Sequence, residues 1–200
     1  MTGHAHFYLN WAKERIDEMD AVLATLEGKV SQLTADARAA ADKAVTDLRT
    51  KREIFFSDMK KQSEAGEAAW AQAKQQLETQ WSGFQAEANT YFEKAAQQAK
   101  QQQAAFEEIA AAQVKAWREA AEKFQVSSAE FAADRRAKME ATAQDMKAGA
   151  AAAEAKLQEL SKAGAASWNA WSTALTESRA AFDRANQAAW EQFKHASRQQ

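Results

Sequence analysis

The segment WAQAKQQLETQWSGFQAEANTYF, residues 70–92, decides the fold because its bulky aromatic residues recur at a helical spacing. Trp70, Trp81 and Phe92 stand eleven residues apart. Eleven residues in three turns is about 3.67 residues per turn, the period of a nearly straight helical seam. A helix with such an edge is expected to pack it against another surface. The predicted seam consists of Trp70, Ala73, Leu77, Trp81, Phe84, Ala88, Phe92, Ala95 and Ala99.

A second seam, spaced as heptads, precedes the aromatic one. Apolar residues alternate at three and four positions without a slip. A repeat of about five heptads predicts a coiled coil rather than a general amphipathic helix. Gly28 lies inside this run but off the seam, where it costs about 1 kcal/mol relative to alanine without ending the helix. The heptad seam consists of Leu9, Ala12, Ile16, Met19, Leu23, Leu26, Val30, Leu33, Ala37, Ala40 and Ala44.

The composition also predicts an all-α fold. The chain has 200 residues, with no proline, no cysteine and 6 glycines, so few positions oblige the backbone to turn. Ala, Gln, Glu, Lys, Arg and Leu are abundant, and these residues lose little side-chain freedom in a helix. Such a composition with a helical period is typical of long helices and coiled coils. We therefore expect long antiparallel helices that form a bundle or a coiled coil.

Two weak points divide the chain into three predicted helices. The apolar content drops around residues 61–66, where serine and glycine occur together, and again at residues 125–128. At the second point Ser127 and Glu130 have the spacing of a capping box, in which each side chain binds the other residue's free backbone N–H. The predicted helices span 5–62, 67–125 and 129–198, within one elongated domain.

The distribution of bulky residues favours folding back over a single rod about 300 Å long, the alternative that the lack of proline leaves open. Aromatic residues are concentrated in 70–131, whereas 132–167 offers mostly alanine with a few Leu and Met. Large side chains that face small ones interdigitate, while two facing aromatic seams would overfill an interface. We therefore expect the aromatic seam to pair with the alanine-rich segment. A further turn near 161–164 would give four helices instead of three.

The charged residues argue against a nucleic-acid interface. The formal net charge is −2, from 26 basic and 28 acidic residues that are interleaved along the chain. Nucleic-acid-binding proteins normally show a basic excess or a basic face. The interleaved segment KERIDE at residues 13–18 predicts a solvated helix surface. The nearest approach to a basic patch comprises Arg49, Lys51, Arg52, Lys60 and Lys61.

Residues that carry out chemistry are scarce in this chain. With no cysteine and only 3 histidines, it lacks the spacings of zinc proteases, phosphate-binding loops, dinucleotide-binding folds and di-iron bundles. His195 follows Glu191 by one helical turn, but a place near the negative end of a C-terminal helix explains this histidine without catalysis. The sequence therefore predicts no enzyme, no cofactor and no small-molecule substrate.

The N-terminus contains the candidate metal site. If Met1 is removed, the chain begins Thr2-Gly3-His4. The free amine, two backbone amides and the His4 imidazole can then surround Cu(II) or Ni(II) in a square plane of nitrogens. His6 lies close by. The alternative interpretation is a chain end that contains histidines without a metal.

The sequence predicts a protein that does not cross a membrane. No stretch approaches 18 apolar residues, and no basic segment followed by an apolar run precedes the first seam, so we expect no secretory signal and a cytoplasmic location. The aromatic seam could still face either a protein core or a lipid surface. Its positions fall within an arc of about 65°, a narrow stripe that favours a coiled-coil core.

Three protein families resemble this chain. Its eleven-residue period is similar to the repeats of exchangeable apolipoproteins, all-helical proteins that bind lipid surfaces. Its Ala/Gln/Phe-rich profile, as in QQAKQQ at 97–102 and AAF at 104–106, resembles that of bacterial phasins, helical coats of polyester granules that oligomerise through coiled coils. Three long antiparallel helices are also similar to BAR-type dimers that curve membranes. These resemblances imply a lipid or granule surface as a partner.

The sequence thus supports two functional hypotheses. The first is a non-enzymatic, self-associating helical bundle that acts as a scaffold or spacer and forms a homo-oligomer. The second is a coat that binds a lipid or storage-granule surface through amphipathic helices. Under either hypothesis, the predicted packing or interaction residues are Leu23, Leu26, Val30, Leu33, Trp70, Leu77, Trp81, Phe84, Phe92, Phe106, Trp117, Trp168, Trp171, Phe182 and Phe193.

Overall fold

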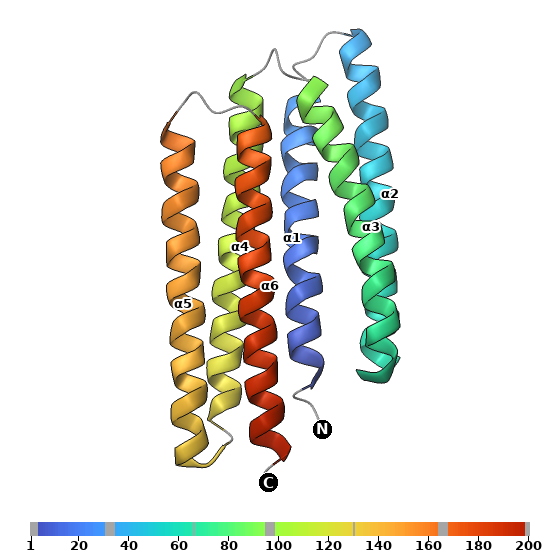
Figure 1. The fold of residues 1–200 in the computed structure, drawn as a ribbon. Helices are drawn as coiled ribbons and strands as arrows, with labels where there is room; N and C mark the ends of the chain where they lie inside the picture. Colours follow the sequence, from blue (N-terminus) through green and yellow to red (C-terminus); the bar gives the residue numbers. More distant parts are fainter. Residues whose placement is uncertain are drawn as a thin grey trace.

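Six long helices account for nearly all of the part of the chain that the computed structural model describes, residues 4–30, 35–65, 67–94, 99–129, 131–163 and 168–198. Successive helices run in opposite directions, so α1 begins and α6 ends at the same end of the molecule (Figure 1). The all-α prediction is confirmed. The helices are α1 (His4–Val30), α2 (Ala35–Ala65), α3 (Glu67–Lys94), α4 (Ala99–Ser128), α5 (Ala133–Lys162) and α6 (Trp168–Arg198).

The helix count corrects the prediction of three or four helices and the alternative of a single rod. The predicted helix 5–62 corresponds to α1 and α2, which pack side by side, and the predicted helix 67–125 corresponds to α3 and α4. The predicted helix 129–198 corresponds to α5 and α6. Within the described residues, α2 ends inside the predicted break at 61–66 and α5 ends inside the optional break at 161–164.

The two breaks that the sequence did not reveal follow α1 and α3. The residues between these helices and their successors, 31–34 and 95–98, contain no proline or glycine, and the apolar spacing continues through both. A tertiary contact accounts for the end of α3, since Gln102 of α4 donates from Nε2 to the backbone oxygen of Phe92 at 2.5 Å. The last carbonyls of a helix have no intrahelical partner, so a side chain that supplies one stabilises the helix end.

The predicted capping box between α4 and α5 is wrong. Ser127 lies within α4, and its supposed partner Glu130 lies outside the described residues. α5 instead begins after Ala132, an extended residue (φ −60°, ψ 156°) that makes no side-chain cap bond. The hydroxyl of Ser128 donates to the backbone oxygen of Gln125 at 2.6 Å, so it serves the end of α4 rather than the start of α5.

The central position of α1 organises the fold. It has α2 and α3 on one side and α4 and α6 on the other, while α5 packs outside α4 and α6 (Figure 1). From Asn10 to Leu26, only Asp20 and Ala24 are exposed. A helix surrounded on several sides cannot keep a full polar face in water. Some of the polar residues of α1 are therefore forced into the interior.

The aromatic seam of α3 packs against α1 and α2, which corrects the prediction that it faces the alanine-rich segment. The Trp11 ring centroid of α1 lies 6.0 Å from that of Trp70 and 6.2 Å from that of Phe55 in α2. At the far end of α3, Phe92 packs on Trp168 of α6 with 4.4 Å between centroids. Aromatic residues thus face aromatic residues here, because α1 separates this part of α3 from α5.

The alanine-rich α5 receives an aromatic residue from α4 instead. Trp117 of α4 packs so closely on Gly149 of α5 that a Cβ there would lie 2.7 Å from the indole Cζ2. Around this contact α4, α5 and α6 form a hydrophobic cluster that includes Met146, Ala150 and Phe182. A separate, larger cluster surrounds α1. The expected packing of a large side chain against small ones therefore occurs between α4 and α5, and not along the aromatic seam of α3.

Candidate functional site

A network of charged side chains lies buried where α1, α4 and α6 meet. Glu14, Arg15 and Glu18 of α1 are only 1%, 3% and 2% exposed. Arg179 of α6 and Gln113 of α4 are buried with them. Buried charges are rare in proteins unless they are paired, so this cluster is the most unusual feature of the interior.

The sequence-based prediction of a solvated surface at residues 13–18 is therefore wrong for three of its residues. A signal for burial was present in the sequence. Trp11 and Val22 stand seven and four residues from Glu18, on the same side of the helix but away from the heptad seam. A helix that carries large apolar residues on a second face is expected to be covered there too, together with any polar residues between them.

Glu18 is held by side chains from two other helices. Arg179 binds it in a bidentate manner, with Nε 3.0 Å from Oε1 and Nη2 2.6 Å from Oε2. The Gln113 side chain donates from Nε2 to Glu18 Oε1 at 2.7 Å and to the backbone oxygen of Leu175 at 3.0 Å. Charge-assisted bidentate bonds of this kind are both strong and strict in geometry. They define how far α6 and α4 can slide along α1.

A second bidentate pair lies one turn of α1 closer to the chain start. Arg15 donates from Nη1 and Nη2 to the two carboxylate oxygens of Asp183 in α6, at 2.8 and 2.6 Å. The same Nη1 lies 2.7 Å from Glu14 Oε2. Asp183 is partly exposed, so the network extends from the centre of the bundle to its surface at α6.

The two buried glutamates of α1, Glu14 and Glu18, have opposite pKa shifts. Burial, followed by the negative charge of Glu18, raises the pKa of Glu14 well above its ordinary value. Burial also disfavours charge on Glu18, but the Arg179 guanidinium and the surrounding hydrogen bonds outweigh it and lower the pKa of Glu18. The charges of Arg15 and Arg179 pair with those of Asp183 and Glu18, and the raised pKa of Glu14 favours the neutral form of this third carboxyl group. This pairing satisfies the requirement that buried charges be paired.

The geometry suits helix alignment rather than chemistry on a substrate. The cavity lined by Glu18, Trp81 and Arg179 measures about 30 Å³, about the volume of one water molecule in the liquid. Arg15 lies 4.6 Å from the ring centroid of Trp11, and Arg179 lies 4.8 Å from that of Trp81. These cation–π contacts orient both guanidinium planes. Each arginine is thus held by a carboxylate and an aromatic ring.

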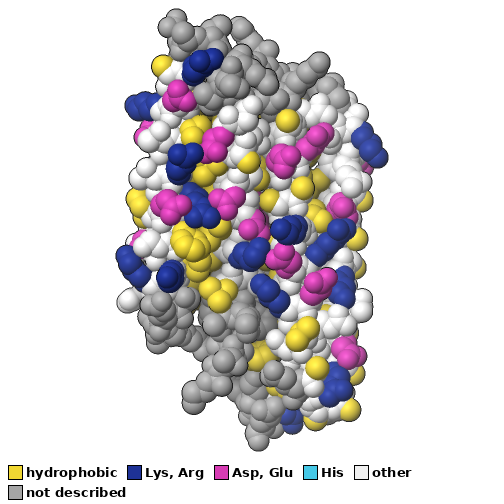
Figure 2. Space-filling model, turned by 180° about the vertical axis from the view of Figure 1, so that it is seen from behind, with side chains coloured by type: hydrophobic (Ala, Val, Ile, Leu, Met, Phe, Trp, Pro, Cys, Tyr) yellow, Lys and Arg dark blue, Asp and Glu magenta, His cyan; other side chains and the backbone are white. Residues whose placement is uncertain are grey.

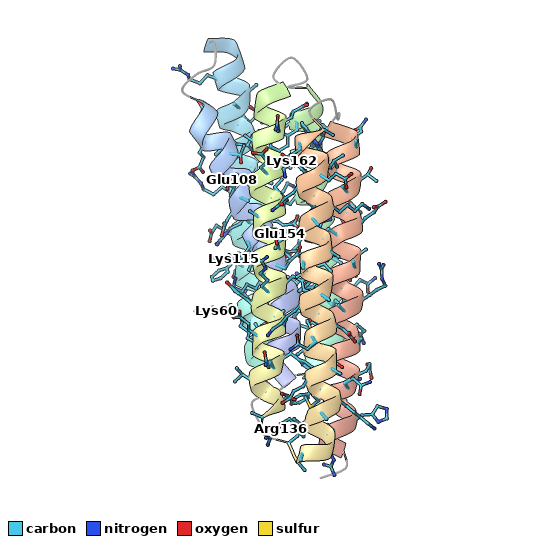
Figure 3. The ribbon with its side chains drawn as sticks, turned by 90° about the vertical axis from the view of Figure 1, so that its left-hand side faces the viewer. Lys60, Glu108, Lys115, Arg136, Glu154 and Lys162 are labelled. Atoms are coloured by element: carbon cyan, nitrogen blue, oxygen red, sulfur yellow. The ribbon has the colours of Figure 1, made fainter. Side chains whose placement is uncertain are left out.

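A surface groove of about 520 Å³ runs between α4 and α5. Its rim carries charges of both signs, among them Lys115 of α4 and Glu154 and Lys162 of α5, along the line where these helices meet (Figure 3). Arg118 and Glu154 form an ion pair across it, and the side chain of Ser161 donates to Glu107 at 2.5 Å. Its apolar floor includes Phe106, Ala110, Val114 and Leu157.

The residues predicted as a packing or interaction seam are mostly buried where their side chains are described. The heptad prediction is wrong at Ala40, which is exposed, and Leu9 and Ala44 are only half-buried; the chain folds back after α1, and α2 buries Ala41, Val45 and Leu48 instead. The side chains of Val30, Leu33, Ala37, Ala95 and Ala99 lie outside the described part of the chain. In this structure the contacts of the seam are made within one chain, by the two hydrophobic clusters. The buried members are Leu23, Leu26, Trp70, Leu77, Trp81, Phe84, Phe92, Phe106, Trp117, Trp168, Trp171, Phe182 and Phe193.

Of the three histidines, the structure describes the side chain of His195. The side chains of His4 and His6 lie outside the described residues, so the N-terminal copper or nickel site stays a prediction. Elsewhere, the described His, Cys, Asp and Glu side chains form no group of three that could hold a metal. His195 is exposed, and Glu191 forms an ion pair with Lys194 at 2.7 Å.

The basic residues of α2 do not form a free cationic patch. Their ion pairs are with acidic residues of α1, α2 and α3, and Figure 2 shows the same mixture of Lys or Arg with Asp or Glu side chains across the back of the molecule. A surface of mixed sign gives no strong field for steering a polyanion. The pairs are Arg49–Glu27 at 2.6 Å, Lys51–Glu87 at 3.5 Å, Arg52–Asp20 at 2.9 Å and Lys61–Asp58 at 3.3 Å.

No family model, curated protein or solved structure matches this chain. None of the described helices combines the length and the apolar composition that crossing a membrane requires. The buried network and the surface grooves are therefore the features from which a function is inferred.

Proposed function

We propose that this protein is a non-enzymatic structural protein, a helical bundle that acts as a scaffold or spacer and associates with further copies of itself. The observation that carries the proposal is the network that joins Glu18 of α1 to Gln113 of α4 and Arg179 of α6. Any other register of these helices would leave a charge buried without a partner, at a cost of about 3–5 kcal/mol. A single fixed register is what a rigid spacer requires.

We further propose that a second copy of the chain covers the groove between α4 and α5. In a two-fold contact, the same patch faces itself, so a rim that carries both signs can pair acidic with basic residues. Glu107 and Glu122 supply negative charge, and Lys115 and Lys162 supply positive charge, around an apolar floor. The aromatic seams are engaged within the chain, whereas this groove is an open apolar surface that a second copy could cover.

The mass in solution tests this proposal. We expect the wild-type mass to rise above that of one 22.1 kDa chain between a low and a high protein concentration in sedimentation equilibrium. Ala111→Glu places a charge in the groove at an exposed helix position, and this variant should stay monomeric. The matched control Ala40→Glu, at an exposed position of α2, should behave as the wild type. A wild type that stays at the mass of one chain at both concentrations would contradict self-association.

The coat hypothesis is the second candidate function, and the inward orientation of the aromatic residues favours it. The large aromatic side chains of α3 and α6 that the structure describes lie mainly on the buried faces, while charged residues cover the outside. If the helices separated, these faces would form amphipathic surfaces of the kind that bind lipid.

Vesicles that contain brominated phosphatidylcholine distinguish the two functions. Bromine quenches tryptophan fluorescence only when the indole enters the acyl region, and the chain has 7 tryptophans to report it. A coat should float with the vesicles and lose fluorescence. A scaffold should remain in the dense fraction with its fluorescence and its circular dichroism unchanged.

A further inference from the structure

A second concave surface lies between α5 and α6, on the opposite side of α5 from the α4/α5 groove. It measures about 460 Å³, within the range of sites that hold small molecules. α4 lies behind these two helices and between them, and its Trp117 forms the floor (Figure 1). The walls are built from small residues, which leave the space open: Gly149, Ala152 and Ala153 of α5, and Ala174 and Ala181 of α6.

Two buried polar groups in this pocket have no partner. The indole Nε1 of Trp117 and the hydroxyl of Ser178 make no hydrogen bond with any described residue. Trp117 is 3% exposed and Ser178 is 8% exposed, so the protein itself covers both almost completely. An unsatisfied buried polar group is costly, and a ligand in the pocket that these two residues line could complete their bonding.

The indole of Trp117 lies against Gly149 on the α5 side of the pocket. The three ring atoms closest to the position of a Gly149 Cβ are Cζ2 at 2.7 Å, Cη2 at 3.4 Å and Cε2 at 3.5 Å. Nε1 is bonded to Cε2 and is therefore one bond away from this contact. Any side chain at position 149 would displace the ring, so the glycine admits the indole at this place.

The charges at the mouth favour an anion. Lys156 of α5 and Glu177 of α6 form an ion pair at 2.6 Å and neutralise each other. Arg184 also lines the pocket and is exposed, and it has no acidic partner among the described residues. One uncompensated guanidinium thus lines the same pocket as the residues that carry the two unused hydrogen-bond donors. Arginine is suited to binding carboxylates because its donors match their geometry.

We propose that the α5/α6 pocket binds a small monocarboxylate with an apolar acyl or aryl body. The carboxylate accepts hydrogen bonds from the Trp117 indole N–H and the Ser178 hydroxyl, and Arg184 favours its negative charge. The apolar body lies along the alanine walls. This inference does not depend on the proposed scaffold function, because the pocket lies on the other side of α5 from the groove assigned to self-association.

Octanoate, with about ten non-hydrogen atoms, is a suitable probe for a pocket of this size. We expect a titration of protein labelled with ¹⁵N-tryptophan to move one indole N–H resonance downfield in a saturable manner, below the micelle concentration of octanoate. Trp117→Phe assigns that resonance by its loss. Ser178→Ala should weaken binding about 5-fold, the effect of one ordinary hydrogen bond. 1-Octanol, which lacks the charge, should bind more weakly than octanoate, and Arg184→Gln should remove that difference.

Variants that fill either concave surface locate the site. Ala153→Leu, and independently Ala152→Leu at the exposed rim, should abolish the shift in protein that circular dichroism shows to be folded. The matched control Ala111→Leu fills the α4/α5 groove and should leave the shift unchanged. The proposal is overturned by the absence of a saturable shift, by a shift that survives both pocket-filling variants, or by a shift that only Ala111→Leu removes. Tighter binding of 1-octanol than of octanoate would overturn the assignment to carboxylates.

Discussion

The core around α1 and the core between α4, α5 and α6 hold helices together by different means. Around α1, arginines and carboxylates form bidentate pairs, and aromatic rings pack on other aromatic rings. In the outer core, Trp117 packs against Gly149 and against the ring of Phe182, whose centroid lies 5.8 Å away, with alanines beside them. The first core specifies helix register through buried charges and hydrogen-bond direction, whereas the interior of the second does so mainly through shape. Substitutions should therefore affect the two cores through different mechanisms.

Removing one partner of the charge network should produce the largest effect. Arg179→Met keeps a long side chain but leaves Glu18 charged, buried and unpaired. We expect the free energy of unfolding in urea to fall by about 3–5 kcal/mol. The double variant Glu18→Leu/Arg179→Met should recover most of this loss, because apolar residues replace both charges. If the double variant is no more stable than Arg179→Met, the Glu18–Arg179 pair contributes stability that apolar residues of similar size do not replace.

Filling the closest contact of the outer core should have the next largest effect. Gly149→Ala forces the Trp117 ring to move, and we expect a loss of about 1–3 kcal/mol, although alanine is the better helix former. The controls Gly28→Ala and Gly83→Ala add a methyl group where no atom lies within 4 Å, so each should gain about 0.5–1 kcal/mol in the same urea titration. A stabilised Gly149→Ala would mean that the indole is not fixed against α5.

The pH dependence should separate the two glutamates of the inner core. Because the pKa of Glu14 is raised in the folded protein, its contribution to stability is fully present below the ordinary value of 4.5 and is lost as the pH rises through the folded pKa. Glutamine does not ionise, so Glu14→Gln avoids this loss. The free energy of unfolding of the variant should therefore rise relative to that of the wild type as the pH increases from 4 to 8. Glu18, whose pKa is lowered, contributes in the opposite sense, and its stabilisation is lost as the pH falls.

Urea titrations across this pH range measure the difference between variant and wild type at each pH. Glu18→Gln is the matched control, with the same chemical change one turn along α1. It should be least stable relative to the wild type at neutral pH and approach it in acid. Parallel pH profiles for Glu14→Gln and the wild type would contradict a raised pKa of Glu14.

The smallest effect is expected at the surface. Arg49 and Glu27 form an ion pair at 2.6 Å, like those of the core, but their side chains are 60% and 44% exposed. Water screens such pairs, so Arg49→Ala should change stability by less than about 1 kcal/mol. The contrast with Arg179→Met, measured in the same way, isolates the effect of burial on an ion pair. A loss of stability in Arg49→Ala as large as that in Arg179→Met would contradict the expected difference between an exposed and a buried ion pair.

The helical class and most of the core could be predicted from the chain. The spacing of Trp70, Trp81 and Phe92 identified an edge that is buried in the structure. Helix ends were less predictable, since no proline or glycine marks the breaks after α1 and α3. The end of α3 depends on Gln102, a residue of the following helix. Local propensity contains no information about such a contact.

The candidate sites depended still more on tertiary structure. KERIDE at residues 13–18 has the same charge pattern as a solvated helix, and only the position of α1 among four other helices places Glu14, Arg15 and Glu18 in the interior. Their partners Arg179 and Asp183 stand more than 150 residues away in sequence. The pocket between α5 and α6 likewise requires Trp117 from a third helix.

The sequence by itself determined that this protein is helical and which large side chains avoid water, because helix propensity and apolar periodicity act over a few turns of one segment. The tertiary structure alone decided where the chain folds back, which aromatic residues meet, and which charges are buried. Those outcomes depend on which helices surround each helix, a property of the whole bundle. The eleven-residue seam shows both levels: its burial follows from its spacing, and its partners follow from the central place of α1.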